Sequence, residues 1–266
     1  LTGLVWTKDW NVMKTRDPGF DTDSTAGDGL VTWQHALDYI KKLNQEDYLG
    51  HNDWRLPNVI ELESLVHAGQ SNQADWQNSQ GFSNVQSSDY WSSTSLASNP
   101  NFAWCVGFQD DYGNKSDAYA VRAVRGGQSG AFGSLVISLP RTGQTTCYNA
   151  TGSLIPCAGT GHDGELQMGA AWPGSRFNEN GDQTMTDNLT GLIWTKDGKA
   201  PGPSACGLGA LKTWQESLDY VKCLNTNNYL GHSDWRLPNS KELRSLVHSG
   251  QSNQADWQNS QGFSNV

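Results

Sequence analysis

Hydrophobic residues recur at helical spacing in two stretches of the first third of the chain. The first stretch predicts a helix over residues 32–44, with an apolar stripe made of Trp33, Leu37, Ile40 and Leu43. The second predicts a helix that starts after Pro57, with Asn58 as its N-cap and Glu61 three residues further on. Both helices would pack one face against a core.

After Val85 the apolar period changes from helical spacing to strict alternation. Alternating stretches bounded by Asn, Pro, Gly and Asp predict strands over residues 90–94, 102–108 and 119–125. In the middle strand, Trp104 and Val106 would share one face and Ala103 and Cys105 the other. Two helices followed by a small antiparallel sheet predict an α+β domain.

The chain also repeats itself. Residues 32–85 align without a gap with residues 213–266, and 42 of 54 positions are identical. Residues 1–9 also align without a gap with residues 189–197. We therefore expect a first domain over 1–127 that lacks its N-terminal lead-in, a linker over 128–146, and the lead-in and first half of a second domain over 147–266.

The second copy contains both predicted helices but none of the predicted strands. Its apolar side chains would be left exposed at a cost of roughly 1.5–3 kcal/mol each, and they include Trp214, Leu218, Leu243 and Leu246. We expect this half-domain to be completed by sequence beyond the chain or by another copy. On this interpretation the chain is a window on a longer tandem array.

Composition and charge exclude several classes of protein. No apolar run approaches the roughly 20 residues that a bilayer span needs, and the 12 tryptophans are too many for a disordered chain. A net charge of −9 disfavours binding to nucleic acid. No phosphate-binding Gly-rich loop and no His-Glu-x-x-His motif is present, so we expect no enzyme activity.

Five motifs occur in a characteristic order over the first 125 residues. They are Leu1-Thr2-Gly3-Leu4-Val5-Trp6, Thr32-Trp33-Gln34, Asp53-Trp54-Arg55-Leu56-Pro57-Asn58, Tyr90-Trp91-Ser92-Ser93-Thr94 and Val121-Arg122-Ala123-Val124-Arg125-Gly126-Gly127. In this order the chain resembles the bacterial DUF1566 family, also called the Lcl C-terminal domain family. The resemblance implies a C-type-lectin-like fold, often repeated, on secreted or cell-surface proteins. It also implies adhesins that bind sulfated glycosaminoglycans, which this chain's negative charge would repel.

The five cysteines suggest two disulfides and one remaining thiol. Cys147 and Cys157 bracket a ten-residue turn, and Cys206 and Cys223 bracket a loop and the following helix. The first copy has Lys42 in place of Cys223 and no cysteine matching Cys206, which supports their pairing. Cys105 is expected to be a small buried residue on a strand, or alternatively to form a bridge between chains.

A segment between the two copies carries alternating oxygen-bearing side chains around a glycine. We consider it a candidate calcium loop, with the ligands Asn178, Asn180, Asp182 and Asp187. The alternative is a plain Asn-Gly turn between strands.

The chain contains more aromatic residues than one core requires. Trp6, Trp33 and Trp54, with their second-copy equivalents, are expected in the core. Other aromatic residues are candidate contacts to glycans or to a neighbouring repeat, namely Trp76, Trp257, Tyr90, Trp91, Trp104 and Tyr112.

The sequence thus favours a non-catalytic tandem unit of a bacterial extracellular filament or surface fibre, with copies of itself as partners in a head-to-tail array. The alternative is a surface adhesin that binds carbohydrate.

Overall fold

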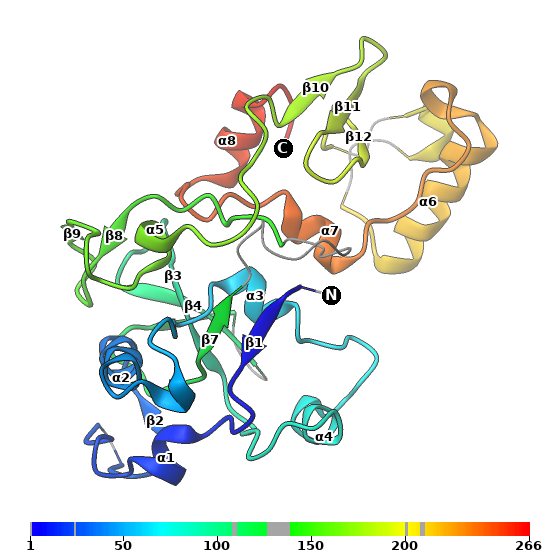
Figure 1. Ribbon diagram of the computed structural model, residues 1–266. Helices are drawn as coiled ribbons and strands as arrows, with labels where there is room; N and C mark the ends of the chain where they lie inside the picture. Colours follow the sequence, from blue (N-terminus) through cyan, green and yellow to red (C-terminus); the bar gives the residue numbers. More distant parts are fainter. Residues whose placement is uncertain (1, 24, 108–110, 127–138, 200–201, 208–210) are drawn as a thin grey trace. The chain divides into compact units, whose positions relative to one another are not determined.

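The structure, a computed structural model, describes residues 2–23, 25–107, 111–126, 139–199, 202–207 and 211–266 (Figure 1). The packing of the backbone divides the chain into two compact units, Leu1–Ala171 and Trp172–Val266. Each unit combines helices with small sheets, so the mixed α+β class predicted from the sequence is confirmed. Within the described ranges, no helix has both the length and the apolar character needed to cross a bilayer.

The helices of the first unit include both predicted ones. The predicted helix over 32–44 is α2 (Trp33–Gln45), and the second is a short α3 (Val59–Glu63). Asn58 caps α3 as predicted, because its side chain accepts from the Glu61 amide while the Glu61 side chain accepts from the Asn58 amide. The sequence did not predict the further helical segments α1 (Val12–Arg16), η1 (Tyr48–Gly50), α4 (Gln73–Ser79) and α5 (Asp163–Leu166).

A five-stranded sheet forms the centre of the first unit. Its order is β2-β6-β3-β4-β5, and all pairs are antiparallel except β3 with β6. The strands are β2 (Leu30–Val31), β6 (Tyr119–Ala120), β3 (Tyr90–Ser95), β4 (Phe102–Val106) and β5 (Tyr112–Asn114). The alternation predicted for β4 is confirmed, since Ala103 and Cys105 are buried and their neighbours are half-exposed. Phe108, at the end of the predicted strand, lies outside the described residues.

The last predicted strand, over 119–125, is divided between two sheets. Its first part is β6, whereas its last part is β7 (Val124–Gly126), which pairs antiparallel with β1 (Leu4–Trp6). Between the two parts, the Arg122 guanidinium lies over the ring of Trp10 in a buried aromatic cluster. The β1–β7 pair brings the beginning and the end of residues 4–126 side by side.

Residues 139–171 pack against this first unit. They form a small hairpin of β8 (Cys147–Tyr148) with β9 (Leu154–Ile155), followed by α5. The sequence assigned residues 147–171 to the second domain, whereas the backbone packing groups them with the first. Of the predicted linker over 128–146, residues 128–138 lie outside the described residues.

The second unit begins with a three-stranded sheet in the order β10-β11-β12. These strands are β10 (Phe177–Glu179), β11 (Thr184–Asp187) and β12 (Ile193–Thr195), and all pairs are antiparallel. The helical segments that follow are η2 (Ser204–Cys206), α6 (Trp214–Thr226), η3 (Tyr229–Gly231), α7 (Ser240–Ser245) and α8 (Gln254–Ser260). All but η2 correspond in order to the helical segments from α2 to α4.

Several local hydrogen bonds are the same in the two copies. Asn239 caps α7 with a capping box, as Asn58 caps α3, and Thr213 forms the capping box that its spacing to Glu216 predicts. Asn44 binds both backbone groups of Trp54, and Asn225 does the same for Trp235. We call residues 1–85 and 189–266 the two helical halves. The sequence of the helical half specifies much of its own local structure with or without a covering sheet.

The cores of the two copies differ. In the first unit Trp33, Leu37 and Leu62 are buried. In the second unit Trp214 is 74% exposed and Leu243 is 51% exposed, and Leu218 also faces solvent, as predicted. Leu246 was expected to be exposed but packs against a small core made of Phe177, Met185, Trp257 and Phe263.

These two environments predict opposite outcomes for one substitution. Trp33→Ala should destabilise the first unit by about 3–5 kcal/mol because it empties a buried indole site. Trp214→Ala should change the free energy of unfolding by no more than about 0.5 kcal/mol, as expected for a surface position. Calorimetric unfolding of the chain and both variants tests this pair, and equal losses would show that Trp214 is buried in solution.

Candidate functional site

The strands of the first unit cover its helical half through specific hydrogen bonds. The indole of Trp33 donates to the Ser92 carbonyl, 2.7 Å away, and the indole of Trp91 donates to the Val31 carbonyl at the same distance. The backbone of Arg55 exchanges two hydrogen bonds with Val124. Strand β3 and strand β7 thus pair with groups that belong to residues 31–59.

The equivalent groups of the second unit have no such cover. Trp214 stands where Trp33 does, and its ring is largely in solvent. Arg236 corresponds to Arg55, and its backbone has no hydrogen-bond partner among the described residues. We call this surface, centred on Trp214, Arg236 and Leu243, the open face.

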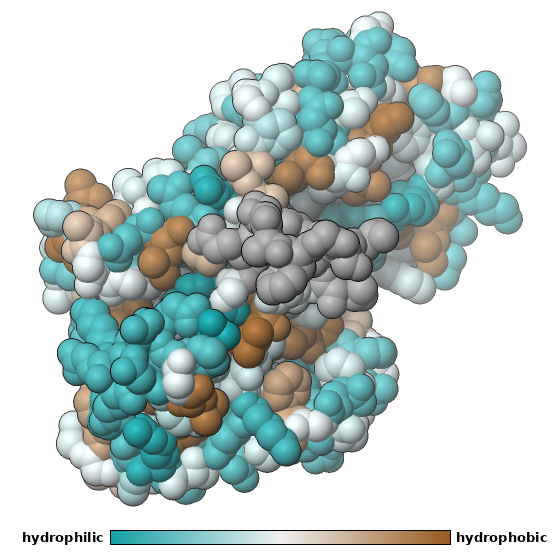
Figure 2. All heavy atoms as spheres, in the orientation of Figure 1, coloured by the Kyte–Doolittle hydropathy of each residue, from teal (hydrophilic) through white to brown (hydrophobic). Residues whose placement is uncertain are grey.

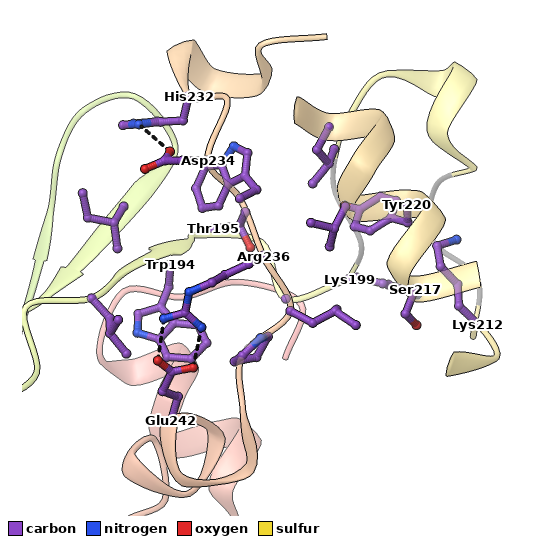
Figure 3. A pocket seen from close by; sticks show the side chains of 18 of the residues that line it. Trp194, Thr195, Lys199, Lys212, Ser217, Tyr220, His232, Asp234, Arg236 and Glu242 are labelled. Atoms are coloured by element: carbon purple, nitrogen blue, oxygen red, sulfur yellow. Dashed lines mark hydrogen bonds and ion pairs between the residues drawn. The ribbon is translucent and has the colours of Figure 1, made fainter. Parts of the chain in front are cut away.

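A groove of about 800 Å³ opens beside Arg236, one of the residues of the open face. Figure 3 shows it between α6, which contributes Ser217 and Tyr220, and the segment that carries Arg236. Its apolar lining consists of Leu192, Ile193, Trp194, Leu211, Val221, Leu224, Trp235, Leu237 and Pro238. Most of these positions correspond to core residues of the first unit. The groove is therefore the part of the core that β3 and β7 cover in the first unit. In Figure 2, hydrophobic residues are visible on the surface of both units.

The groove contains an arginine–carboxylate ion pair. Arg236 binds both carboxylate oxygens of Glu242, at 2.6 and 2.5 Å, and this hydrogen bonding lowers the pKa of Glu242 to about 2 (Figure 3). His232 lies 4.0 Å from Asp234. The equivalent Arg55 binds Glu61 in the same bidentate way, but there the pair is buried beneath Gly126. Asp53, two residues before Arg55, pairs with Arg125 at 2.7 Å.

A buried polar seam holds residues 139–171 to β3 in the first unit. Asp163 is fully buried, and its Oδ2 accepts hydrogen bonds from Thr94 at 2.8 Å and Thr142 at 2.6 Å. Burial raises the pKa of Asp163 to about 6, and the two hydroxyls offset part of that rise. The side chain of Gln144 pairs with both backbone groups of Ser95, in the way that a neighbouring strand would.

Lys115 is the second charged residue of this seam. Its ammonium donates to Ser95 Oγ and to the carbonyls of Tyr148 and Asn149, and it lies 4.1 Å from the centre of the Trp33 ring. Burial lowers the pKa of Lys115 to about 7. Neither Lys115 nor Asp163 was identified from the sequence, because their partners are far away in the chain and no local pattern marks them.

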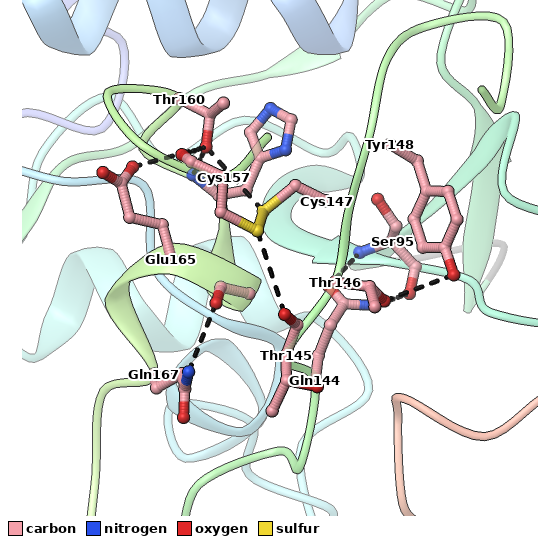
Figure 4. The surroundings of a disulfide bond; sticks show 12 residues. Ser95, Gln144, Thr145, Thr146, Cys147, Tyr148, Cys157, Thr160, Glu165 and Gln167 are labelled. Atoms are coloured by element: carbon pink, nitrogen blue, oxygen red, sulfur yellow. Dashed lines mark hydrogen bonds between the residues drawn. A yellow bond between two sulfur atoms is a disulfide. The ribbon is translucent and has the colours of Figure 1, made fainter. Parts of the chain in front are cut away.

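Both predicted disulfides are present. Cys147 bonds to Cys157, and Figure 4 shows this bond among Thr145, Thr160 and Glu165 in the segment that carries the seam. Cys206 bonds to Cys223 and ties η2 to α6 in the second unit. Cys105 is buried on β4, as expected for a small core residue.

The candidate calcium ligands do not meet. In the turn between β10 and β11, the Asp182 carboxylate accepts hydrogen bonds from the backbone amide and the hydroxyl of Thr184. The Asn180 side chain donates to the Thr184 hydroxyl and accepts from the Thr186 hydroxyl. Asn178 accepts from Ser175. Asp187 lies at the other end of β11, buried against Arg176. In the described part of the chain, no three His, Cys, Asp or Glu side chains could together hold a metal ion. The segment itself forms the antiparallel hairpin of β10 and β11.

The candidate aromatic contacts have different environments. Tyr90 and Trp91 are buried in the first unit, so they are corrected to core residues, and Trp257 is a core residue of the second unit. Trp76 is half-buried against His67. Tyr112 is 50% exposed, and its ring contacts the edges of Phe102 and Trp104. This last group presents several aromatic rings at the surface of the sheet.

With this geometry in place, the chain can be compared with known proteins. Residues 1–125 and 183–266 match the Lcl C-terminal domain. Together these ranges span more than half of the chain, and the chain belongs to that family. The second range contains the helical half but no counterpart of residues 86–125. Searches of curated proteins and of solved structures returned no match.

The buried Asp163 predicts a dependence of stability on pH. The fold raises its pKa from 3.8 to about 6, so the folded state holds this proton more tightly than the unfolded state. The resulting stabilisation is complete below the unfolded pKa and is lost as the pH rises through about 6. The shift corresponds to about 3 kcal/mol.

Asp163→Asn should remove this loss. Relative to the unmodified chain, its free energy of unfolding should increase by about 3 kcal/mol between about pH 4 and pH 7, as measured by urea unfolding at several pH values. Asp219→Asn, at an exposed position of the second unit, is the control. Parallel curves for the Asp163 variant and the unmodified chain would contradict the assignment.

Proposed function

We propose that the protein is a non-catalytic structural repeat of a bacterial extracellular filament or surface fibre, built from C-type-lectin-like domains. The observation that carries this proposal is the open face. The second unit keeps several large core side chains of the repeated helical half, and two of them, Trp214 and Leu243, meet solvent. Large apolar patches on a protein surface mark sites of association with other polypeptides.

Two further features support the proposal. The disulfides Cys147–Cys157 and Cys206–Cys223 are expected in an oxidising compartment outside the cytoplasm. The two copies of the helical half share the capping box of α3 and α7, so one interface can be used again at each repeat of an array. Contacts that repeat from head to tail without closing produce open filaments.

Negative-stain microscopy tests the structural role. Material from the producing cells that contains this chain should form fibres of uniform width, and antibodies to the chain should label them along their length. Antibodies against the reduced and unfolded chain serve as a control, because they show whether epitopes of the chain are hidden inside the fibre. Discrete particles without fibres would contradict the proposal.

A second candidate function is glycan binding. It is favoured by the exposed ring of Tyr112, which stands with Phe102 and Trp104 on β4 and β5. Aromatic rings in such an arrangement can stack on the apolar faces of sugars.

A glycan array probed with and without calcium tests this alternative. If the aromatic group binds sugar, Tyr112→Ala should abolish the signal, because it removes the most exposed ring. The matched control is Leu154→Ala, at an exposed apolar position on β9. An array without hits in either condition would rule out the adhesin function for the glycans tested.

A further inference from the structure

The open face has a template in the same molecule. Residues 32–85 and 213–266 share 42 of 54 positions, and the first unit shows what covers this sequence when it is buried. There, Trp33 donates to Ser92, Pro57 accepts from the Ser93 amide, and the Val59 amide donates to the Thr94 hydroxyl. All three partners lie on β3.

The edge of β12 agrees with the same template. In the first unit the Thr7 amide donates to the Ala123 carbonyl, so Val5 and Thr7 direct their backbone groups toward β7. In the second unit the Lys196 amide donates to the Gln183 carbonyl, so the alternate residues face β11. The edge formed by Ile193 and Thr195 is therefore the one that β7 occupies in the first unit. Among the described residues it has no strand beside it, since β12 ends the sheet.

The layer that the open face lacks corresponds to one segment of the first unit. We call residues 86–171, which carry β3 to β9 and α5, the strand half. In the structure this strand half packs in the first unit, together with the helical half in residues 1–85. If it moved to the open face of another molecule, it would uncover a helical half of its own.

We propose that the open face is a docking site for a free strand half of the same repeat, meaning a polypeptide with the sequence of residues 86–171 that covers no helical half of its own. It binds by adding a β7-like strand to the edge of β12 and by laying a β3-like strand over Trp214. This inference deepens the proposed structural function and rests on it, because an array of repeats is what would offer such a segment.

The test extends the full chain by a second strand half. Residues 250–266 are identical to residues 69–85, so residues 86–171 appended after Val266 meet the junction that they have in the first unit. Hydroxyl-radical footprinting with mass spectrometry then measures the oxidation of Trp214. Trp33 is the internal reference, since it occupies the equivalent buried position and its peptide has a different sequence.

Docking should reduce the oxidation rate of Trp214 to that of Trp33 in the same molecule. A Trp214 that reacts as fast as in the unextended chain, while Trp33 stays protected, would overturn the proposal. The matched control carries Asp in the appended segment at the positions of Trp91 and Val124, and Trp214 should then remain reactive. Protection that persists in this control would also overturn the proposal, because it would not come from docking in register.

Two further outcomes separate this inference from others. If Trp214 in the unextended chain becomes protected as the concentration rises, a second copy is the occupant and the proposal is wrong. If the extended chain protects Trp214 but the native material contains no fibres, the docking site stands and the filament function fails.

Discussion

The fold of the first unit depends on the burial of Trp33. Its indole donates to the Ser92 carbonyl on β3, and its ring packs against the Lys115 ammonium and the His162 imidazole. One side chain on α2 therefore touches the central sheet and the segment that follows the domain. A buried indole needs both an apolar surround and an acceptor for its N–H, and here these come from parts of the chain that are far apart in sequence. Around Trp214 neither a sheet nor a following segment covers the ring, and there α6 still forms but leaves the indole in solvent.

The sequence predicted the parts of the fold that local patterns determine. The apolar stripe of α2, the Asn58 cap and the alternation along β4 each need only neighbouring residues, and each was predicted correctly. The short α4 was missed because its residues 73–79 carry no apolar stripe. The division of residues 119–125 into β6 and β7 was missed because an alternating pattern does not tell which strand lies beside it. The candidate site followed from the repeat itself, which revealed helices without strands.

The seam that holds residues 139–171 shows a different limit of sequence reasoning. Asp163 and Lys115 look like surface residues in the sequence, yet both are buried and hydrogen-bonded to distant backbone or hydroxyl groups. Burial disfavours the charged form of each, which raises the pKa of the acid and lowers that of the amine. A buried polar contact of this kind specifies one arrangement, because any shift of the segment would leave the carboxyl without its two donors. The strand half therefore includes residues 139–171 as well as the strands from β3 to β7. We expect a cover for the open face to need both of these parts.

The open face keeps part of the core surface of the first unit. Trp214, Leu218 and Leu243 are unchanged, and a face that stayed in water would gain nothing from them. The buried Val31, Ala36 and Val59, in contrast, are replaced by Lys212, Ser217 and Ser240. In the first unit Lys42 secures α2 through ion pairs with Asp17 and Glu46. At that position the second copy has Cys223, whose disulfide to Cys206 fixes α6 covalently. A helix held in place before its partner arrives loses less conformational freedom on binding. The bridge therefore lies in the copy whose apolar face is exposed, and holding α6 in place would lower the cost of covering that face.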